Sequence, residues 1–231
     1  MRIDFIRHGQ CNDNAFLRGR SDTGLSFLGQ RQMRRTLDDI NLPELVVCSP
    51  AKRSADLAQS YYLEASSITE VELWDDFQER DFGIWDGLSF EAIQALDSVG
   101  LQKYLDQPFN YEISGSETLE AFETRVKKVF RKLLDYGLEK EVDHLVVVTH
   151  GGVMRVLLKQ VLGLNDFALF QLEMGFASRM SLECIETSPE NMMAFAEQLE
   201  QLSAQDSGRS VEKPDQYYIK LLELTQCPLK A

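Results

Sequence analysis

Short, almost wholly apolar runs alternate along this chain with longer amphipathic segments. The runs at residues 3–6, 45–48 and 144–149 have the length of strands that are buried on both faces of a sheet. The segments at residues 28–40 and 152–162 repeat their apolar positions at the spacing of a helix. Strands that alternate with helices in this way predict an α/β domain. We expect a three-layer α/β/α fold with a mostly parallel central sheet.

Weaker patterns predict further elements in the rest of the chain. A third strand is expected after the second helix, two more helices in the middle of the chain, and two strands near its end. These elements are expected at residues 71–74, 90–105, 119–136, 180–185 and 218–224.

Glycine, serine and proline residues mark the expected boundaries of several helices. Ser49-Pro50 suits the start of a helix, because serine is a good N-cap and proline fits the first helical position. Gly100 is expected to break the helix at residues 90–105. Gly137 and Gly163 are expected to close the helices that precede them.

One stretch differs in composition from the rest. Residues 187–215 are polar and acidic, and we interpret them as a surface insertion between the two strands of a hairpin, with a helix at about residues 189–202. A disordered or partner-binding segment is the alternative. We therefore expect residues 1–231 to form a single domain with this insertion before the last strand.

Composition narrows the range of functions. The chain has 231 residues, of which 44% are hydrophobic, and this is enough for one domain with a large core. Its formal net charge of −13 argues against nucleic acid and anionic membrane surfaces as partners. No run reaches the ~18 apolar residues of a membrane-spanning helix, and the first residues carry no signal-peptide pattern.

The cysteines point to a reducing compartment. The four cysteines are scattered and show neither the Cys-x-x-Cys pattern nor the Cys/His spacing of a zinc site. We expect reduced thiols in a cytoplasmic protein, without a metal or a cofactor.

Two of the three histidines share one local setting. His8 and His150 each end an apolar run, and glycine follows each of them. Both imidazoles should therefore lie at the carboxyl ends of strands, where ligands of parallel α/β sheets bind. Imidazole is the side chain best suited to react or titrate near neutral pH.

Cationic and acidic residues accompany these histidines. Arg7 precedes His8, Arg53 follows a strand end by a few residues, and Glu79 lies among aromatic side chains. Two guanidinium groups can hold a phosphoryl group, an imidazole can attack its phosphorus, and a carboxylic acid can protonate the leaving oxygen. Each residue alone would be an ordinary strand-end, helix or loop residue, so the hypothesis depends on their co-occurrence.

The order of these motifs resembles that of the histidine phosphatase superfamily, also called the phosphoglycerate mutase-like family. The matching segments are Arg7-His8-Gly9 with Asn14, Ser49-Pro50-x-x-Arg53, Glu79-x-x-Phe82-Gly83-x-Trp85-Asp86-Gly87, Gly115-Ser116-Glu117-Thr118 with Arg125, and Val148-Thr149-His150-Gly151-Gly152-x-x-Arg155. The resemblance implies a phosphoglycerate mutase-like fold over residues 1–186.

The resemblance also implies a role for each matching residue. It makes His8 the nucleophile that becomes phosphohistidine and Glu79 the proton donor, which then activates water. The residues that would contact the phosphoryl group are Arg7, Asn14, Arg53, His150 and, through its backbone N–H, Gly151.

Within the family, two positions favour a phosphatase over a phosphoglycerate mutase. Asp13 stands where mutases have tryptophan, and Gly152 stands where they have asparagine. The short stretch between Glu79 and Gly115 also favours a phosphatase. Residues 17–22 resemble those of α-ribazole phosphatases, although broad-specificity sugar phosphatases are similar there.

We therefore expect a metal-independent phosphomonoesterase. Its substrate would be a small phosphorylated metabolite, with α-ribazole 5′-phosphate as a candidate. The alternatives are a phosphoglycerate mutase and a scaffold that binds a phosphorylated ligand on the same fold. The sequence leaves the oligomeric state open, with a homodimer as one option.

Overall fold

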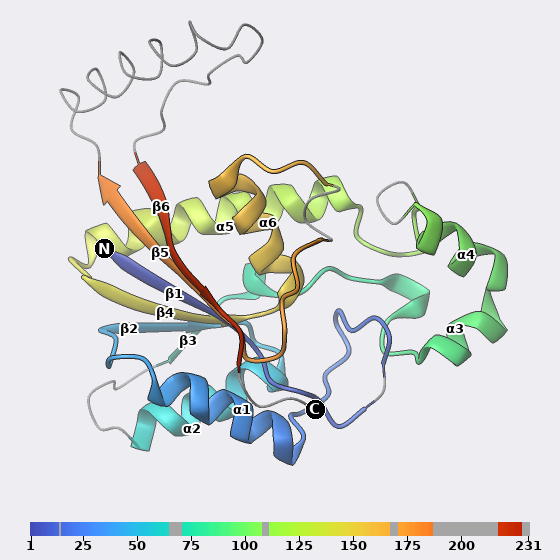
Figure 1. Cartoon of the computed structure of the whole chain (residues 1–231), viewed down its shortest axis with the longest axis horizontal. Coiled ribbons are helices and arrows are strands. Elements are labelled where there is room, and N and C mark those ends of the chain that lie inside the picture. The colour runs from blue at the N-terminus through green and yellow to red at the C-terminus, as the bar shows by residue number, and fades with distance from the viewer. Residues whose placement is uncertain (14, 65–70, 108–110, 167–170, 187–216, 228–231) are drawn as a thin grey trace, which may run out of the picture.

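The computed structural model describes residues 1–13, 15–64, 71–107, 111–166, 171–186 and 217–227. Its centre is a six-stranded sheet with the strand order β3-β2-β4-β1-β5-β6 (Figure 1). The first four strands in this order are parallel, whereas β5 is antiparallel to both β1 and β6. The strands are β1 (Arg2–Arg7), β2 (Leu45–Cys48), β3 (Val71–Leu73), β4 (His144–Thr149), β5 (Arg179–Glu186) and β6 (Tyr217–Thr225).

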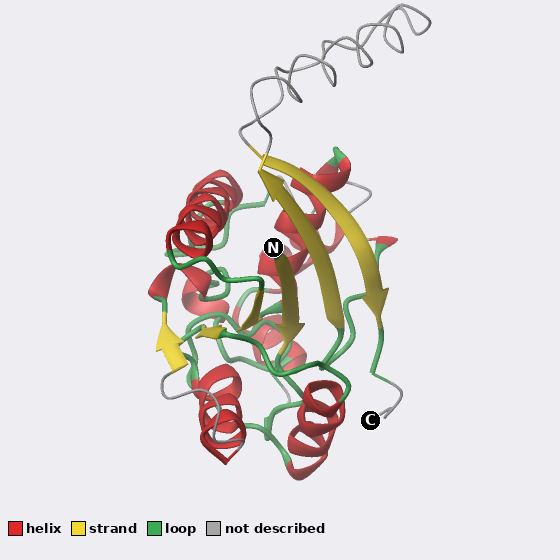
Figure 2. Ribbon diagram, turned by 90° about the vertical axis from the view of Figure 1, so that its left-hand side faces the viewer, coloured by secondary structure: helices red, strands yellow, loops and turns green. Residues whose placement is uncertain are grey.

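Alternate residues of the central strands serve two separate hydrophobic cores. Ile3 and Phe5 pack on one face with residues of the two later helices, while Ile6 packs on the other face with residues of the two early ones. Figures 1 and 2 show these helices on opposite sides of the sheet. This arrangement confirms the three-layer α/β/α fold. The helices are α1 (Phe27–Asp38), α2 (Lys52–Glu64), α5 (Leu119–Glu139) and α6 (Gly151–Leu162).

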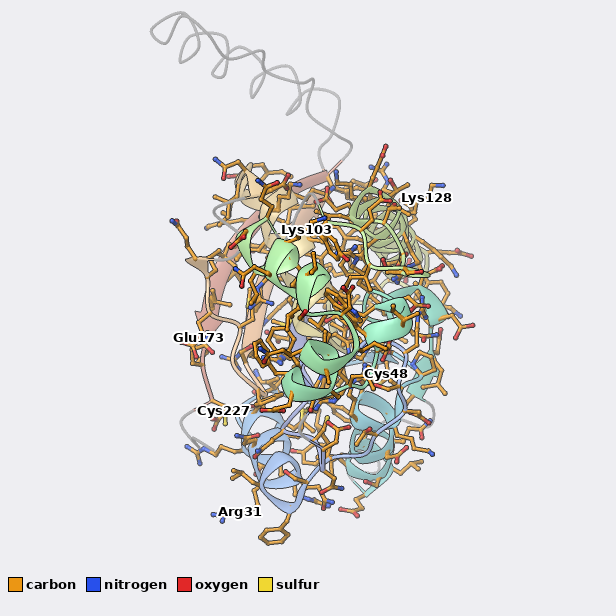
Figure 3. All side chains as sticks on the ribbon, turned by 90° about the vertical axis from the view of Figure 1, so that its right-hand side faces the viewer. Arg31, Cys48, Lys103, Lys128, Glu173 and Cys227 are labelled. Atoms are coloured by element: carbon orange, nitrogen blue, oxygen red, sulfur yellow. The ribbon has the colours of Figure 1, made fainter. Side chains whose placement is uncertain are left out.

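A small lobe lies beyond the carboxyl ends of the parallel strands. It contains α3 (Phe90–Leu96), α4 (Ser98–Asp106) and the short turn η2 (Gly83–Trp85). Trp85 and Ile93 are fully buried in a hydrophobic cluster of its own. Figure 3 looks onto this side of the molecule, where α3 and α4 lie in front of the sheet. We call this unit the α3–α4 lobe.

Three expected helix boundaries are wrong. The helix expected at residues 90–105 breaks at Asp97 rather than at Gly100, because the Asp97 carboxylate accepts from the Gly100 N–H at 2.8 Å and caps α4.

The other two boundaries concern α5 and α2. The helix α5 does not end at Gly137 but runs through it to Glu139. A Cβ at Gly137 would overlap the end of the Met1 side chain, so the glycine leaves room for that residue. Finally, α2 begins at Lys52, so Ser49-Pro50 does not open it.

The two strands expected near the chain end pair with each other in antiparallel fashion. The strand β5 pairs with β6 from Arg179 opposite Thr225 to Glu186 opposite Tyr217, with an irregularity after Ser181. The expected insertion at residues 187–215 and its helix lie outside the described residues, so both stay predictions. Within the described part of the chain, no helix combines the length and the apolar character that a membrane crossing requires.

Candidate active site

The two histidines of the shared motif meet at one edge of the sheet. The strands β1 and β4 are hydrogen-bonded neighbours, with Arg7 opposite Thr149 at their carboxyl ends. His8 and His150 follow these two residues, and their ring centroids are 5.3 Å apart with the planes at 65°. The structure therefore brings together two imidazoles that are far apart in the sequence.

A backbone carbonyl fixes the tautomer of His8. The Nδ1 atom of His8 lies 2.8 Å from the carbonyl oxygen of Gly9, and a carbonyl can only accept a hydrogen bond. Nδ1 therefore carries the proton, and the lone pair is on Nε2. The side chain is 4% exposed. Burial lowers the pKa of His8 well below its usual value, and the positive charges of Arg7 and Arg53 lower it further.

Both predicted phosphate-binding arginines are held by carbonyl oxygens. Arg7 donates through Nη1 to Met174, and its guanidinium lies 4.3 Å from the ring centroid of Phe176. Arg53 is fully buried and donates to the carbonyls of Ser21 and Gly19 at 2.6 Å each. Burial lowers the pKa of Arg7 to about 10, which leaves it charged at neutral pH.

Ser49 is part of the site. Its hydroxyl lies 2.7 Å from Nε2 of His150, and both residues are fully buried. Burial lowers the pKa of His150 well below its usual value, and the charge of Arg53 adds to this effect. A neutral imidazole whose Nε2 is occupied by Ser49 has only Nδ1 free for a ligand.

Three buried nitrogen atoms around His8 have no hydrogen-bond partner among the described residues. They are Nε of Arg7, Nε of Arg53 and Nδ1 of His150. Buried polar atoms are almost always paired, and two of these three are donors on cationic groups. The cluster therefore fits an anion with several acceptor oxygens.

Glu79 approaches this cluster from the loop that follows η1 (Asp75–Phe77). Its Oε2 accepts from the N–H of Gly152 at 2.8 Å, and its Oε1 accepts from the N–H of Arg80 at 3.0 Å. Its negative charge raises the pKa of both Arg7 and Arg53 against the larger effect of burial. The carboxylate is thus close to both arginines.

Arg125 holds the Glu79 loop in place. From α5 it donates to the backbone carbonyls of Asp76 at 2.8 Å, Gln78 at 2.9 Å and Glu79 at 3.3 Å. Glu117 pairs with the same guanidinium at 2.9 Å and 2.7 Å. Arg125 and Glu117 together therefore hold the loop in position.

A second carboxylate organises the loop that holds Arg53. Asp86 accepts hydrogen bonds from the backbone N–H groups of Gly19 at 3.2 Å, Arg20 at 2.6 Å and Ser21 at 3.0 Å. The carbonyls of Gly19 and Ser21 are those that accept from Arg53. The loop is therefore held on one side by Asp86 and on the other by Arg53.

The structure gathers most of the predicted site. His8, Arg7, Arg53, Glu79 and His150 all border the cluster of unpaired nitrogens. Gly151 opens α6, and a Cβ built there would lie 3.2 Å from Nε of Arg7. Asn14 lies outside the described residues.

Sequence reasoning missed the roles of three residues. It assigned Ser49 to a helix cap, whereas the hydroxyl binds His150. It noted Arg125 and Asp86 only as parts of matching motifs and gave neither of them a task. No pattern of spacing indicates that a side chain binds the backbone of a distant loop, because these contacts join segments 46 to 67 residues apart.

Among the described residues, no group of three or more His, Cys, Asp or Glu side chains is arranged to hold a metal ion. The family model that describes the histidine phosphatase superfamily (branch 1) matches residues 3–195, most of the chain. The chain belongs to the histidine phosphatase superfamily.

Relatives within this superfamily carry phosphatase names. The chain is 26% identical to phosphoserine phosphatase 1 of Hydrogenobacter thermophilus over 71% of its own length and 78% of that protein. It is 24% identical to the adenosylcobalamin/alpha-ribazole phosphatase of Escherichia coli, over 79% of its own length and 90% of that protein. It spans only 48% of three mycobacterial proteins to which it is 27% identical.

A solved structure shares the fold. A mycobacterial glucosyl-3-phosphoglycerate phosphatase, determined as a complex with VO3, superimposes with a TM-score of 0.67 at 26% identity. The match covers 79% of this chain and 92% of the other.

Proposed function

We propose that this histidine phosphatase hydrolyses a phosphomonoester through a phosphohistidine on His8. The main support is the set of buried nitrogens on Arg7, Arg53 and His150, near the His8 ring, that have no hydrogen-bond partner among the described residues. A phosphoryl group offers the oxygens that these donors lack. Burial and positive neighbours keep the His8 imidazole neutral, as a nucleophile must be.

The proposed reaction has two steps. Nε2 of His8 attacks phosphorus, the bond to the leaving oxygen breaks, and Glu79 gives that oxygen its proton. In the second step, water attacks the phosphohistidine, Glu79 takes the proton from this water, and inorganic phosphate leaves with Nε2 of His8 free again. Arg7 and Arg53 would stabilise the charge on the equatorial oxygens in both steps.

Hydrolysis is favoured over mutase activity. Asp13, at the position of the mutase tryptophan, forms an ion pair with Arg18. Gly152, at the position of the mutase asparagine, leaves the space that the Glu79 carboxylate occupies. Among relatives, the phosphatase names above also favour hydrolysis, although a phosphoglycerate mutase-like protein of Arabidopsis thaliana is 26% identical as well.

Several finer points belong to the same proposal. The reaction would need no metal, because guanidinium groups neutralise the phosphoryl charge. The substrate would be a small metabolite such as α-ribazole 5′-phosphate or phosphoserine, which are named for the relatives above. A cytoplasmic location is in keeping with free thiols at all four cysteines.

Hydrolysis of p-nitrophenyl phosphate in the presence of EDTA tests this function. We expect the wild-type protein to turn over and to form an acid-labile, base-stable phosphoenzyme. His8→Ala should abolish both. Binding of phosphorylated ligands without turnover would favour the scaffold instead, and loss of activity with EDTA followed by rescue with a divalent ion would refute metal independence.

The role of Glu79 has its own test. Glu79→Gln should slow phenyl and alkyl phosphates far more than p-nitrophenyl phosphate, because only poor leaving groups need the proton. Equal slowing of all three substrates would count against Glu79 as the acid.

A further inference from the structure

An additional guanidinium lies beside the site and is not used in the mechanism above. Arg155 is on α6, four residues after Gly151, so the two residues share one face of the helix. Nη1 of Arg155 lies 3.6 Å from the point that a Cβ of Gly151 would occupy, and Nε of Arg7 lies 3.2 Å from the same point. Arg7 and Arg155 are therefore neighbours at the N-terminus of α6.

Arg155 has no partner within the described part of the chain. Its Nε is buried and makes no hydrogen bond there. No described carboxylate forms an ion pair with its guanidinium. Partly enclosed arginines are normally paired, so this one is available to a ligand.

Tyr104 is within electrostatic reach of both Arg155 and Arg80. Arg80 is 7% exposed and donates through Nε to the carbonyl of Glu117 at 2.8 Å. Tyr104 belongs to the α3–α4 lobe, and its ring packs edge-on against Trp85 at 5.7 Å. Burial raises the pKa of Tyr104, and the charges of both Arg80 and Arg155 oppose this rise. Both guanidinium groups therefore lie near the phenol.

The charges do not balance when a phosphoryl group alone is bound. Among the described residues, Arg7, Arg53 and Arg155 form no ion pair. A phosphomonoester brings nearly two negative charges at neutral pH. Glu79 carries a proton when it acts as the acid, so it contributes none at that moment. At least one of these positive charges then remains uncompensated, and Arg80, which donates to a backbone carbonyl, adds to the excess.

We propose that Arg155 binds a second anionic group of the substrate, a carboxylate or a second phosphate, beside Arg80 and Tyr104. This inference rests on the proposed phosphatase function and names the class of its substrate. A guanidinium holds either group through paired hydrogen bonds, and the Tyr104 hydroxyl can donate a further one. The preferred substrates are thus small phosphomonoesters with a second negative charge near the ester.

Matched substrate pairs test the proposal. 3-Phosphoglycerate and glycerol 3-phosphate differ in a carboxylate, and glucose 1,6-bisphosphate and glucose 6-phosphate differ in a second phosphate. We expect wild-type kcat/KM to favour the doubly anionic member of at least one pair by about 10- to 100-fold. The pair that shows the preference identifies the anionic group.

Arg155→Gln should remove this preference, mainly by raising KM, and Arg155→Lys should keep part of it. Both variants should hydrolyse p-nitrophenyl phosphate within about twofold of wild type. Arg31→Gln is the matched control, because Arg31 is exposed on α1, far from the lobe (Figure 3). Arg31→Gln removes the same charge and should leave the ratio of kcat/KM within each substrate pair unchanged.

Two results would overturn the subsite. One is a wild-type enzyme that does not discriminate within either pair. The other is an Arg155→Gln variant that slows both members of a pair equally, which would place Arg155 on the phosphoryl group or in the fold. Failure of the phosphatase function looks different, since the wild type would then hydrolyse no substrate at all, including p-nitrophenyl phosphate.

Discussion

At the scale of single residues, a serine hydroxyl decides how His150 presents its ring. Ser49→Ala would leave Nε2 of His150 without a partner in a fully buried place. The ring would then be free to rotate or to change tautomer, and Nδ1 would no longer be held toward the anion. We expect kcat/KM for p-nitrophenyl phosphate to fall by about tenfold, because a buried group that loses its partner costs about 1–3 kcal/mol.

Ser54 provides the control for this variant. It is also fully buried, it lies in the first turn of α2, and its hydroxyl has no hydrogen-bond partner among the described residues. Ser54→Ala should therefore leave activity and melting temperature nearly unchanged. An Ser49→Ala enzyme with wild-type kinetics would show that His150 needs no such support.

A glycine separates the effect on activity from the effect on stability. A Cβ at Gly152 would overlap the carboxylate of Glu79. This carboxylate is the free end of a flexible side chain, so it can move away at small cost to the fold. We expect Gly152→Ala to lower kcat by about tenfold or more while the free energy of unfolding changes by less than about 1 kcal/mol.

Urea unfolding and steady-state kinetics of the same samples measure both quantities. Gly24→Ala is the matched control, since a Cβ at Gly24 would meet nothing within 4 Å. The idea fails if Gly152→Ala keeps full activity, or if its activity falls only in step with its stability.

At the scale of elements, the Arg125–Glu117 pair positions a loop for catalysis without reaching the anion itself. Arg125→Met would free the carbonyls of Asp76, Gln78 and Glu79. Glu79 would then be less well oriented as an acid. We expect alkyl phosphates to lose about ten times more activity than p-nitrophenyl phosphate, the same pattern as Glu79→Gln in a weaker form.

The control for this prediction is on the same helix. Lys127 pairs with Glu123 on the surface of α5, with a side chain 48% exposed. Lys127→Met should change neither substrate, because an exposed pair contributes little. A uniform loss across leaving groups in Arg125→Met would assign the clamp to stability instead of to the acid.

Elements and motifs differ in how far the sequence predicts them. The strands β2 and β4 have the expected bounds, because a buried strand is an uninterrupted apolar run. The sequence predicts the boundary between α3 and α4 at Gly100 rather than at Asp97. Both aspartate and glycine mark helix boundaries, and only the structure shows that the Asp97 side chain caps α4. Likewise, Ser49 fits a cap in sequence, and only the pairing of β2 with β4 takes it to His150 instead.

Carboxylates and arginines of the site show the same limit. Arg7 and Arg53 were predicted because a strand end and an early helical turn place them by local structure alone. In the sequence, Arg155 is indicated only as the last residue of a matching motif. Its importance comes from the absence of a described partner, and that depends on tertiary packing.

At the scale of the whole molecule, the two ends of the sheet have different tasks. The carboxyl end carries the chemistry, whereas toward the amino end β1 buries a charged network. Asp4 is fully buried and lies 2.7 Å from Nε2 of His144 and 3.1 Å from Nε of Arg2, with a further bond from Ser181. Burial alone would raise the pKa of Asp4, but these hydrogen bonds lower it to about 2.

This network makes stability depend on acid without involving catalysis. The pKa of Asp4 is about 2 in the folded state and 3.8 as the ordinary value. A carboxylate whose pKa is lower in the folded state stabilises the fold at pH values above its pKa in the unfolded state. This contribution is lost as the pH falls from about 4 to 2. Asp4→Asn should therefore cost about 2 kcal/mol at pH 7, and the difference from wild type should shrink through that window.

Chemical unfolding from pH 7 down to 2.5, with kinetics at pH 7, measures this effect. Asp39→Asn is the control, because its ion pair with Arg35 is on the surface with the Asp39 side chain 55% exposed. We expect that variant to match wild type at every pH. Asp4→Asn should keep wild-type kcat and KM, since the network does not touch the phosphoryl site. A large kcat change in Asp4→Asn would mean that the amino end of the sheet also affects the chemistry, so that the two ends do not have separate tasks.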